Sequence, residues 1–526
     1  MSVNYSAMPT LAHIPTYHAG LRPHEVAIEC DGRITDWATL ARHMRQVANA
    51  LLNDGVRAGD HICTITTNSD EFLELMFGAA RIGAIFTPIV HRLAVPEVTA
   101  IAADADAKLI FVGPSHVQDA AAYAEAVGGL TNVIGFEDGA QGIRSFAQWR
   151  DAASDAEPAH QPTEDDIALQ LYTSGTTGKP KGVMLSNFNL LGSKLPAISA
   201  NLSWNEWQDG DVNLVAMPNG HIGGVGWAIA GLFNGAKTLV QREFSPDGTL
   251  QAMADGITKL FIVPAALQMC LMHPRVREID YSRLRNILYG ASPIALDLLR
   301  EATEVFGCGF CQQYGMTETT GTIVYLPPED HSPEGTARMR AAGKPLPGVE
   351  IRIVGDDGAV LPPFETGEIQ SRSGYNMVGY HKRPDATKET VDDEGWLKTG
   401  DAGYMDEDGY LYIQDRIKDM VVSGGENVYP AEVESAIYGH PAIQEVAVIG
   451  VPDPKWGEAV KAIVVLRPGE SATPEEIIAF ARSRIAGFKV PKSVDFTDAL
   501  PRNPSGKILR RFLREPYWEG HDRRVN

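Results

Sequence analysis

The sequence predicts an α/β protein that is built largely from parallel sheets. Short apolar runs recur through the first 290 residues, and sequence of helix length separates each run from the next. Parallel strands need such connections, because each crossover has to return along the sheet. After about residue 345 the pattern changes to short strands with Gly and Asp-Gly turns, which is typical of a small antiparallel or barrel-like unit.

The N-terminal third shows this alternation first. Thr35 or Asp36 can cap a helix whose apolar side chains recur at helical spacing over residues 37–51, and Gly55 ends it. A second helix is expected at residues 70–82. Strands are expected at residues 61–66, 84–90, 108–112, 167–172, 212–217, 237–241, 259–263 and 286–290.

The C-terminal part alternates helix and strand once more. From about residue 417, helix patterns at 431–439 and 474–485 alternate with strand patterns at 445–451 and 461–467. We therefore expect a large N-terminal domain with two parallel-type α/β subdomains and a small β-barrel-like subdomain, followed by a small α+β domain.

The charge of the chain is strongly acidic and unevenly distributed. Its 46 Lys and Arg against 67 Asp and Glu give a net charge of −21, which argues against a surface that grips nucleic acid. Residues 482–524 are the exception, because they hold eleven basic and five acidic side chains. A basic end on an acidic body is a candidate surface for anionic ligands.

The cysteines and the apolar stretches bear on the compartment. Five cysteines in a long chain do not form a disulfide framework, and the lone pair Cys308 and Cys311 lacks a second ligand pair at zinc spacing. The N-terminus does not have the pattern of a signal peptide, and no apolar run approaches the length of a transmembrane segment. A cytoplasmic protein is expected.

The most informative stretch is LYTSGTTGKPKGVMLSN at residues 171–187. It gathers glycines, hydroxyls and lysines, and a polyphosphate needs these groups as close donors and counter-charges. The spacing excludes a Walker A loop and hence a P-loop kinase, because only two residues separate Gly175 from Gly178 and Pro180 stands where Ser or Thr is required. On composition alone, a flexible Gly/Thr turn is the alternative.

Two further stretches suit a nucleotide. YGMTET at 314–319 places a carboxylate beside hydroxyls, which a hard cation that bridges phosphate oxygens prefers. A Thr-Glu pair also begins many helices, so this stretch has a second interpretation. GASP at 290–293 follows a predicted strand, and its small residues admit a flat ligand closely.

Three other stretches complete the set. MPNGHIGGVGW at 217–227 has glycines beside a tryptophan and no carboxylate to pair an amino group, so it suits an apolar acid, although its histidine could be a packed loop residue. The run at 396–434 contains Asp401 and a Gly-rich turn. PRNPSGKILRR at 501–511 contains Lys507, which by itself would be interpreted as a solvated surface charge.

Together these stretches resemble the adenylate-forming superfamily, which contains acyl-CoA synthetases, aryl-CoA ligases such as 4-coumarate:CoA ligase, beetle luciferases and the adenylation domains of peptide synthetases. The signatures occur in the order of that family and cover essentially the whole chain. The resemblance implies an AMP-binding domain over residues 1–415 and a mobile C-terminal domain over residues 416–526, which swings about a hinge near 416–418.

The resemblance also implies roles for individual residues. The implied catalytic residues are Lys507, Thr176, Glu318 and His221. Those implied in binding ATP or coenzyme A are Thr173, Ser174, Gly175, Thr177, Gly178, Lys179, Lys181, Gly290, Ala291, Ser292, Gln313, Tyr314, Gly315, Thr317, Asp401, Arg416, Lys418, Ser423, Gly424, Gly425 and Lys507. Those implied in the acyl pocket are His221, Gly223, Gly224, Trp227, Gly315 and Gly321.

Several of these roles have a clear chemical logic. Tyr314 would stack on adenine, and the Asp401 carboxylate would accept hydrogen bonds from ribose hydroxyls. Glu318 would hold Mg²⁺. Lys507 would place a cation between the attacking carboxylate and the α-phosphate, which otherwise repel each other. Val422 and Asn427 stand where many CoA ligases carry a lysine and a glutamine or arginine.

The implied activity is ATP- and Mg²⁺-dependent ligation of a hydrophobic fatty or aryl acid to coenzyme A, through an acyl-adenylate. Its partners would be the carboxylic acid, ATP and coenzyme A, with no nucleic acid, and a homodimer is compatible with it. One alternative is a free-standing adenylation enzyme that loads a carrier protein. The other is a non-catalytic homologue, which is disfavoured because Glu318, Asp401, Arg416 and Lys507 are all present.

Overall fold

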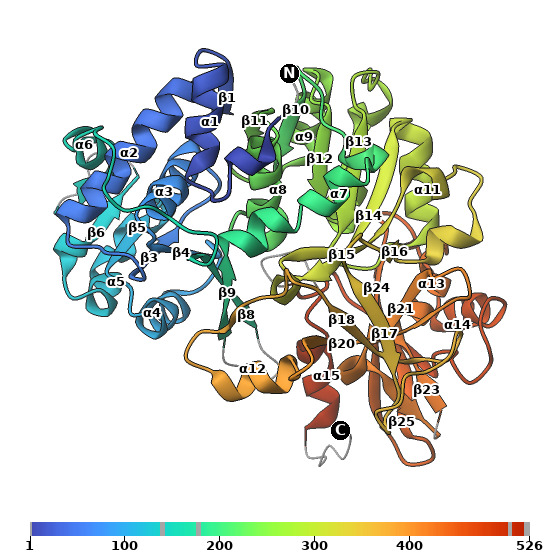
Figure 1. The fold of residues 1–526 in the computed structure, drawn as a ribbon. Coiled ribbons are helices and arrows are strands. Elements are labelled where there is room, and N and C mark those ends of the chain that lie inside the picture. The colour runs from blue at the N-terminus through green and yellow to red at the C-terminus, as the bar shows by residue number, and fades with distance from the viewer. Residues whose placement is uncertain (1–2, 137–141, 175–179, 425, 503–507, 520–526) are drawn as a thin grey trace.

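Four sheets organise the computed structural model, which describes residues 3–136, 142–174, 180–424, 426–502 and 508–519 (Figure 1). Two large sheets form most of residues 1–345. A four-stranded sheet and a five-stranded sheet follow in the C-terminal part of the chain. The expected α/β class and the expected order of units are confirmed.

The first large sheet has nine strands, with a parallel centre and antiparallel edges. In spatial order they are β16 (Lys344–Pro345), β15 (Gly321–Leu326), β14 (Gly309–Met316), β13 (Asn286–Gly290), β12 (Lys259–Ile262), β10 (Val212–Val215), β11 (Lys237–Val240), β1 (Val26–Cys30) and β2 (Arg33–Asp36). Strands β10 to β14 pair in parallel, whereas β15 returns antiparallel along β14.

The second large sheet has eight strands and the same character. In spatial order they are β19 (Gly379–Tyr380), β9 (Pro180–Ser186), β8 (Ile167–Ser174), β4 (Ile85–Ile89), β3 (His61–Ile65), β5 (Leu109–Val112), β6 (Val133–Gly135) and β7 (Arg144–Ser145). From β8 to β7 the pairs are parallel, and β8 and β9 form an antiparallel hairpin at one edge.

Helices cover both faces of each large sheet, as buried parallel strands require. Those of this region are α1 (His13–Leu21), α2 (Trp37–Asn53), α3 (Asp70–Arg81), α4 (Val95–Asp104), α5 (Ala120–Ala126), α6 (Phe146–Asp151), α7 (Leu195–Ser199), α8 (Ile222–Phe233), α9 (Pro246–Ala254), α10 (Pro264–Leu271) and α11 (Leu296–Phe306). The largest core lies between the two sheets and contains the apolar faces of α2, α3 and α8. Separate cores lie under α9 to α11 and under α4 and α5.

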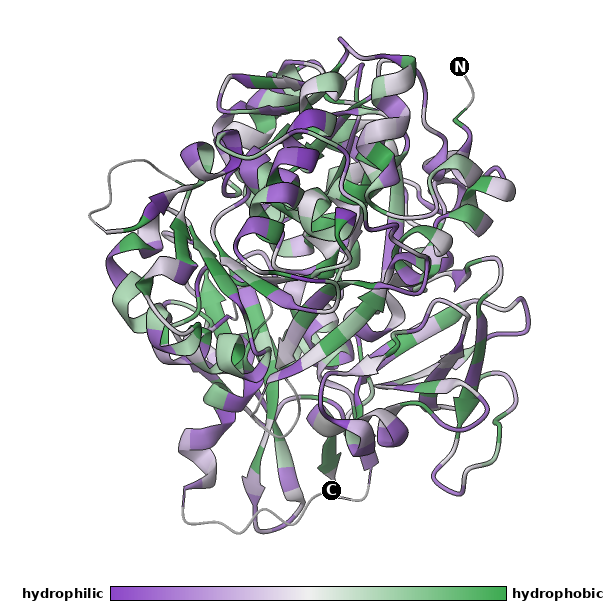
Figure 2. Ribbon diagram, turned by 60° about the vertical axis from the view of Figure 1, so that its left-hand side comes forward, coloured by the Kyte–Doolittle hydropathy of each residue, from purple (hydrophilic) through white to green (hydrophobic). Residues whose placement is uncertain are grey.

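Helix α2 shows how the local sequence sets these boundaries. Its apolar face is buried from Trp37 to Leu51, and the side chain of Asp36 accepts a hydrogen bond from the amide of Thr39 at 2.8 Å. Asp36 rather than Thr35 is therefore the cap. Figure 2 shows hydrophobic residues concentrated on the strands of the large sheets, with hydrophilic residues on the helices around them.

The unit expected after residue 345 is antiparallel. Its strands, in spatial order, are β17 (Glu350–Val354), β18 (Gly367–Arg372), β20 (Trp396–Met405) and β21 (Leu411–Arg416), and α12 (Pro384–Thr390) lies between β19 and β20 in the chain. The order is open, with β17 and β21 at its edges, and Leu411 bridges to Gly343 of the preceding segment.

The last sheet belongs to the C-terminal unit. In spatial order it contains β23 (Glu426–Val428), β22 (Val421–Ser423), β25 (Gly457–Leu466) and β24 (Ile443–Asp453), and β26 (Ser493–Phe496) pairs with β25. Helices α13 (Pro430–Tyr438) and α14 (Pro474–Arg482) cover one face, and α15 (Arg510–Trp518) covers the other. The 3₁₀ turn η10 (Ile417–Asp419) connects β21 to this unit. Among the described residues, no helix is both long and apolar enough to cross a bilayer.

Candidate active site

The β8–β9 hairpin carries the phosphate-type loop found in the sequence. Thr173 lies at the end of β8 and Lys181 near the start of β9, where the two residues are paired. Gly175, Thr176, Thr177, Gly178 and Lys179 lie outside the described residues, as does the side chain of Ser174. The structure therefore gives the positions of the two residues at the base of the loop, Thr173 and Lys181, and does not describe residues 175–179 at its tip.

The turn between β14 and β15 brings Glu318 to this hairpin. Glu318 belongs to the 3₁₀ turn η7 (Thr317–Thr319) and is 5% exposed. Its Oε1 accepts a hydrogen bond from the Thr173 hydroxyl at 3.3 Å. Thr317 begins the same turn and is partly exposed. Two motifs that lie 145 residues apart in the sequence thus meet at one carboxylate.

A second group forms where β14 meets β20 and β21. The hydroxyl of Tyr314 donates to Asp401 at 2.8 Å, and the Arg416 guanidinium lies 3.4 Å from the other oxygen of that carboxylate. Asp401 and Arg416 are cross-strand partners, so their pairing follows from the strand register. Burial and the Asp401 charge raise the pKa of Tyr314 well above its usual value, so its hydroxyl stays a donor.

The GASP loop follows β13 closely beside this group. A Cβ at Gly290 would collide with the carbonyl oxygen of Gln313, so only glycine allows these strands to approach. Ala291 has a φ of +66°, a left-handed conformation that costs energy for a residue with a Cβ. Ser292 follows and is partly buried, while Gln313 accepts a hydrogen bond from Thr322.

His221 is the N-cap residue of α8, whose first turn carries Gly223 and Gly224. Burial, with a smaller contribution from His91, lowers the pKa of His221 to about 4, and its buried Nε2 has no hydrogen-bond partner among the described residues. Gly223 faces the Phe261 ring, which a Cβ would meet at 2.9 Å. Trp227, one turn further, packs against Trp207 with tilted rings whose centroids lie 5.6 Å apart.

Gly315 and Gly321 lie between the predicted acyl residues on α8 and the turn that carries Glu318. They lie on the neighbouring strands β14 and β15, where Gly315 is paired with Thr322, and a Cβ on Gly315 would collide with the Gly321 carbonyl oxygen. Gly321 in turn approaches Ile222 at the start of α8. The predicted acyl residues therefore lie along the β14–β15 turn and α8.

The C-terminal loop residues lie apart from these groups. Ser423 ends β22 and Gly424 follows it, and the amide of Gly424 donates to the carbonyl of Trp456 at 2.8 Å. Ser423 pairs with Glu426 and with Gly457, both within the C-terminal unit. Gly425 and Lys507 lie outside the described residues, as does the side chain of Lys418.

Five of the eleven basic residues at 482–524 form ion pairs within the C-terminal unit, so these five do not form a free basic surface. The residues of this stretch that pair with carboxylates are Lys489, Arg502, Arg510, Arg511 and Arg514. A charge count along the sequence could not reveal most of these partners, because only Glu515, the partner of Arg511, lies on the same helix and the others come from α13, β24 and η10. All five cysteines are free, as expected.

Sequence reasoning missed two aromatic residues. Tyr380 of β19 donates from its hydroxyl to Glu318 at 2.9 Å, and its ring faces the Lys181 ammonium at 4.8 Å. Trp456 is 39% exposed beside Gly424, with Lys455 and Lys492 near its ring. Neither residue belongs to a sequence motif that binds metal or phosphate. Only the structure reveals them, by placing Tyr380 against Glu318 and Trp456 against Gly424.

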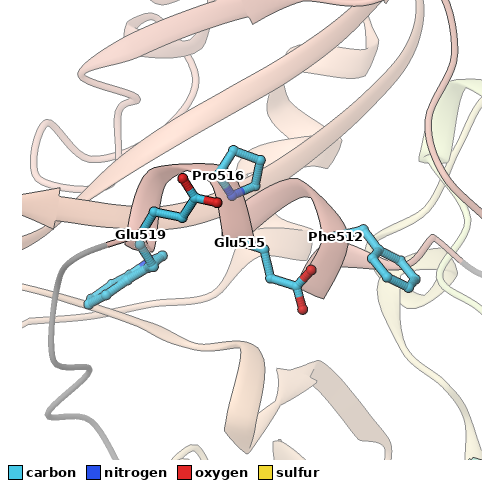
Figure 3. Close-up of a pocket in the computed structure, with 5 residues that line it drawn as sticks. Phe512, Glu515, Pro516 and Glu519 are labelled. Carbon is cyan, nitrogen blue, oxygen red and sulfur yellow. The ribbon is translucent and has the colours of Figure 1, made fainter.

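Two cavities lie away from all these groups. One, of about 530 Å³, is lined by residues of α15 and the residue after it, including Phe512 and Glu515 (Figure 3). The other, of about 300 Å³, lies among β2, α2, α3 and α6. Neither is lined by a residue that the sequence assigned to ATP, acid or thiol.

Comparison with known proteins gives the family. A family model of AMP-binding enzymes matches residues 16–381, and the model of the AMP-binding enzyme C-terminal domain matches residues 432–507. The chain is 40% identical to the fatty acid–[acyl-carrier-protein] ligase ScoC of Streptomyces coeruleorubidus, over 100% of this chain and 99% of that protein. It is 38% identical to a feruloyl-CoA synthase of an Amycolatopsis species, over 96% of this chain and 98% of that protein.

Solved structures agree. ATP-bound MatB from Rhodopseudomonas palustris superimposes with a TM-score of 0.86 at 33% identity, over 98% of this chain and 100% of that one. The apo form of the same protein, at the same coverage, gives 0.77. Both family models and full-length similarity therefore show that this chain belongs to the AMP-binding enzyme family.

Proposed function

We propose that this protein is an AMP-forming carboxylate:thiol ligase. It joins a hydrophobic fatty or aryl acid to ATP, releases pyrophosphate, and transfers the acyl group from the resulting adenylate to the thiol of coenzyme A. The observation that supports this most directly is the meeting of Thr173, Lys181 and Glu318 beside the Tyr314–Asp401–Arg416 group. The first set suits phosphates, and the second suits a nucleoside.

The nucleoside part of ATP would lie along β14 and the GASP loop. Tyr314 would stack on adenine, Asp401 would accept from the ribose hydroxyls, and Arg416 would neutralise nearby phosphate charge. Thr173, Thr176 and Lys179 or Lys181 would hold the remaining phosphates. Lys507 would stabilise the transition state as the carboxylate attacks the α-phosphorus, so positioning and electrostatics supply most of the rate.

The residues around Glu318 fit a hard divalent cation such as Mg²⁺. Two hydroxyl donors occupy Oε1 of this buried carboxylate, and its Oε2 has no hydrogen-bond partner in the part of the chain that the structure describes. Among those residues no set of three His, Cys, Asp or Glu side chains is placed to hold a metal. This suits Mg²⁺, which binds one or two carboxylates together with substrate phosphates and neutralises their charge.

The thiol step would use the C-terminal unit, residues 416–526, as a mobile domain that rotates near 416–418. The whole chain superimposes with a higher TM-score on ATP-bound MatB than on apo MatB. This difference supports assigning the present arrangement of the two domains to adenylate formation. After rotation, Ser423, Gly424 and Gly425 would meet the pantetheine arm. The exposed Trp456 ring with Lys455 and Lys492 beside it suits an adenine and a phosphate, which favours coenzyme A.

A carrier protein is the second candidate acceptor, and the full-length similarity to ScoC favours it. A carrier protein presents the same pantetheine thiol without the adenine of coenzyme A. Substitution of Trp456 by Ala separates the two. It should raise the KM for coenzyme A and leave that for a pantetheinylated carrier protein unchanged, if coenzyme A is the acceptor.

The reaction itself is tested with a panel of carboxylic acids. We expect ATP–pyrophosphate exchange with hydrophobic acids, and Lys507→Ala should abolish this exchange while it retains thioester formation from supplied acyl-adenylate. Arg511→Met, a change at a nearby exposed cation, is the control and should alter neither step. Equal loss of both half-reactions in Lys507→Ala would contradict the divided roles, and no exchange with any acid would contradict the ligase.

A further inference from the structure

The Glu318 carboxylate is held by two hydroxyls from different strands of the eight-stranded sheet. Tyr380 donates to Oε1 at 2.9 Å from β19, and Thr173 donates to the same oxygen at 3.3 Å from β8. A carboxylate with both donors on one oxygen cannot turn freely, because rotation would break both bonds. Its second oxygen is thereby kept available in one direction.

Tyr380 also contacts a lysine of the phosphate-type loop. The Lys181 ammonium lies 4.8 Å from the centre of the Tyr380 ring, within the range of a cation–π contact. One aromatic side chain therefore touches Glu318 through its hydroxyl and Lys181 through its ring. These two residues come from different sheets, on η7 and β9.

The backbone around Tyr380 is fixed as well. Tyr380 is 7% exposed and is the β-sheet partner of Val183 on β9, and its amide donates to the Thr387 hydroxyl at 2.9 Å.

We propose that Tyr380 is a positioning residue that fixes Glu318 for a phosphate-bound divalent cation and Lys181 for the same phosphates. This rests on the proposed function, because it assumes that ATP and a metal bind at the β8–β9 hairpin. The Tyr380 hydroxyl orients the Glu318 carboxylate, whereas the ring orients the Lys181 ammonium. The two parts of the side chain can therefore be tested separately.

Tyr380→Phe removes the hydroxyl and keeps the ring. We expect the affinity for Mn²⁺, measured by electron paramagnetic resonance with a non-hydrolysable ATP analogue, to fall about tenfold to hundredfold, as for loss of a hydrogen bond to a charged group. The Mg²⁺ concentration for half-maximal pyrophosphate exchange should rise in parallel. Tyr380→Leu removes the ring too and should additionally raise the KM for ATP.

Tyr410→Phe is the matched control. The Tyr410 hydroxyl donates to the Asp330 carboxylate at 2.8 Å, and this residue has no contact with Glu318 or Lys181 among the described residues. If the Tyr380 hydroxyl had only a structural role, Tyr380→Phe, like Tyr410→Phe, would lower the midpoint of thermal unfolding and leave the Mn²⁺ affinity as in the wild type. If Tyr380→Phe does not fold, Tyr380→His, which keeps a ring and a donor, is measured against Tyr380→Leu and should bind Mn²⁺ more tightly.

The outcomes distinguish this inference from the proposed function. Wild-type protein that activates acids, with Mn²⁺ affinity unchanged in Tyr380→Phe, would overturn the role of Tyr380 alone. The same holds if Tyr380→His and Tyr380→Leu bind Mn²⁺ equally. Wild-type protein that binds no metal–nucleotide complex would overturn both.

Discussion

His221 illustrates how position changes the chemistry of a single residue. Its ring lies at the first turn of α8 with a pKa of about 4, because burial and, to a smaller extent, His91 disfavour the charged form. An isolated histidine would titrate near pH 6.5. His221 is therefore neutral throughout the pH range in which an enzyme of this kind would work.

This gives a prediction for His221→Asn, which replaces the ring with a side chain that cannot be charged. The activity of both proteins should show the same dependence on pH between 5 and 8, because neither side chain titrates there. The free energy of unfolding should differ, since the unfolded wild type takes up a proton as the pH falls through 6.5. The wild type should lose up to about 3 kcal/mol between pH 6.5 and 4 that the variant keeps.

Denaturant titrations at several pH values and pH–rate profiles measure the two effects. A pH-dependent difference in activity near pH 6.5 would contradict a neutral His221. At this scale the sequence identified Tyr314, Glu318, Asp401 and Arg416 from their motifs. It did not identify Tyr380, because a buried tyrosine has no spacing rule that would single it out from core aromatic residues.

The antiparallel pair formed by β14 and β15 is the element on which the site depends. Gly315 lies so close to the backbone of Gly321 that a Cβ has no space, and the obstacle is a carbonyl oxygen that cannot rotate away. The turn that carries Thr317 and Glu318 begins immediately afterwards. Any shift between these strands would therefore move the residues proposed to hold phosphate and metal.

Gly315→Ala should consequently lower both stability and activity. We expect a loss of roughly 1–3 kcal/mol in the free energy of unfolding, as for an overpacked core, together with loss of pyrophosphate exchange. Gly20→Ala in α1 is the control, because nothing lies within 4 Å of the added carbon. That change should be neutral or should stabilise the helix by up to about 1 kcal/mol. A Gly315→Ala protein as stable and active as the control would show that β14 and β15 can separate without cost.

The elements themselves were well predicted where periodicity was strong. The helices at 37–51 and 70–82 and the eight strands expected between residues 61 and 290 lie where the hydrophobic pattern indicated them, because burial imposes that pattern. The pattern did not indicate the other strands of the two large sheets, such as β9, β14 and β15. The open strand order of the antiparallel unit could not be read from its turns, because alternation of apolar residues does not say which strands are neighbours.

At the scale of the whole molecule, one cluster of charges lies where β21 leads into the C-terminal unit. Arg510 of α15 lies 2.8 Å from Glu434 on α13, 3.8 Å from Asp415 at the end of β21, and 3.9 Å from Asp419 in η10. Its guanidinium therefore connects the C-terminal helix with the segment that leads into the C-terminal unit. Burial raises the pKa of Asp415 to about 6, and Arg510 is the main cation that opposes this rise.

Arg510→Met should leave three carboxylates without their shared cation. We expect the C-terminal unit to lose about 3–5 kcal/mol, the usual result of removing one partner of a buried ion pair. The loss should be greater at pH 7.5 than at pH 5. The folded pKa of Asp415 lies above its unfolded value and rises further without Arg510, so the unfavourable contribution grows as the carboxylate ionises with increasing pH.

Arg511→Met is the control for this change. Arg511 is exposed and pairs only with Glu515 one turn away within the described residues, so less than about 1 kcal/mol should be lost. Hydrogen exchange of the C-terminal unit, followed at both pH values, measures the difference. Similar exchange in the two variants, or a greater loss at pH 5, would contradict the role of the cluster.

The sequence by itself determined the fold class, the order of the units and the family, because hydrophobic periodicity and long motifs are local properties of the chain. It also named most residues of the candidate site. Only the tertiary structure decided which of them touch. Thr173 and Glu318 meet across 145 residues, Tyr380 joins them from β19, and several basic residues of the C-terminal end pair with carboxylates of their own unit. Those contacts depend on strand order and register, which a linear pattern does not specify.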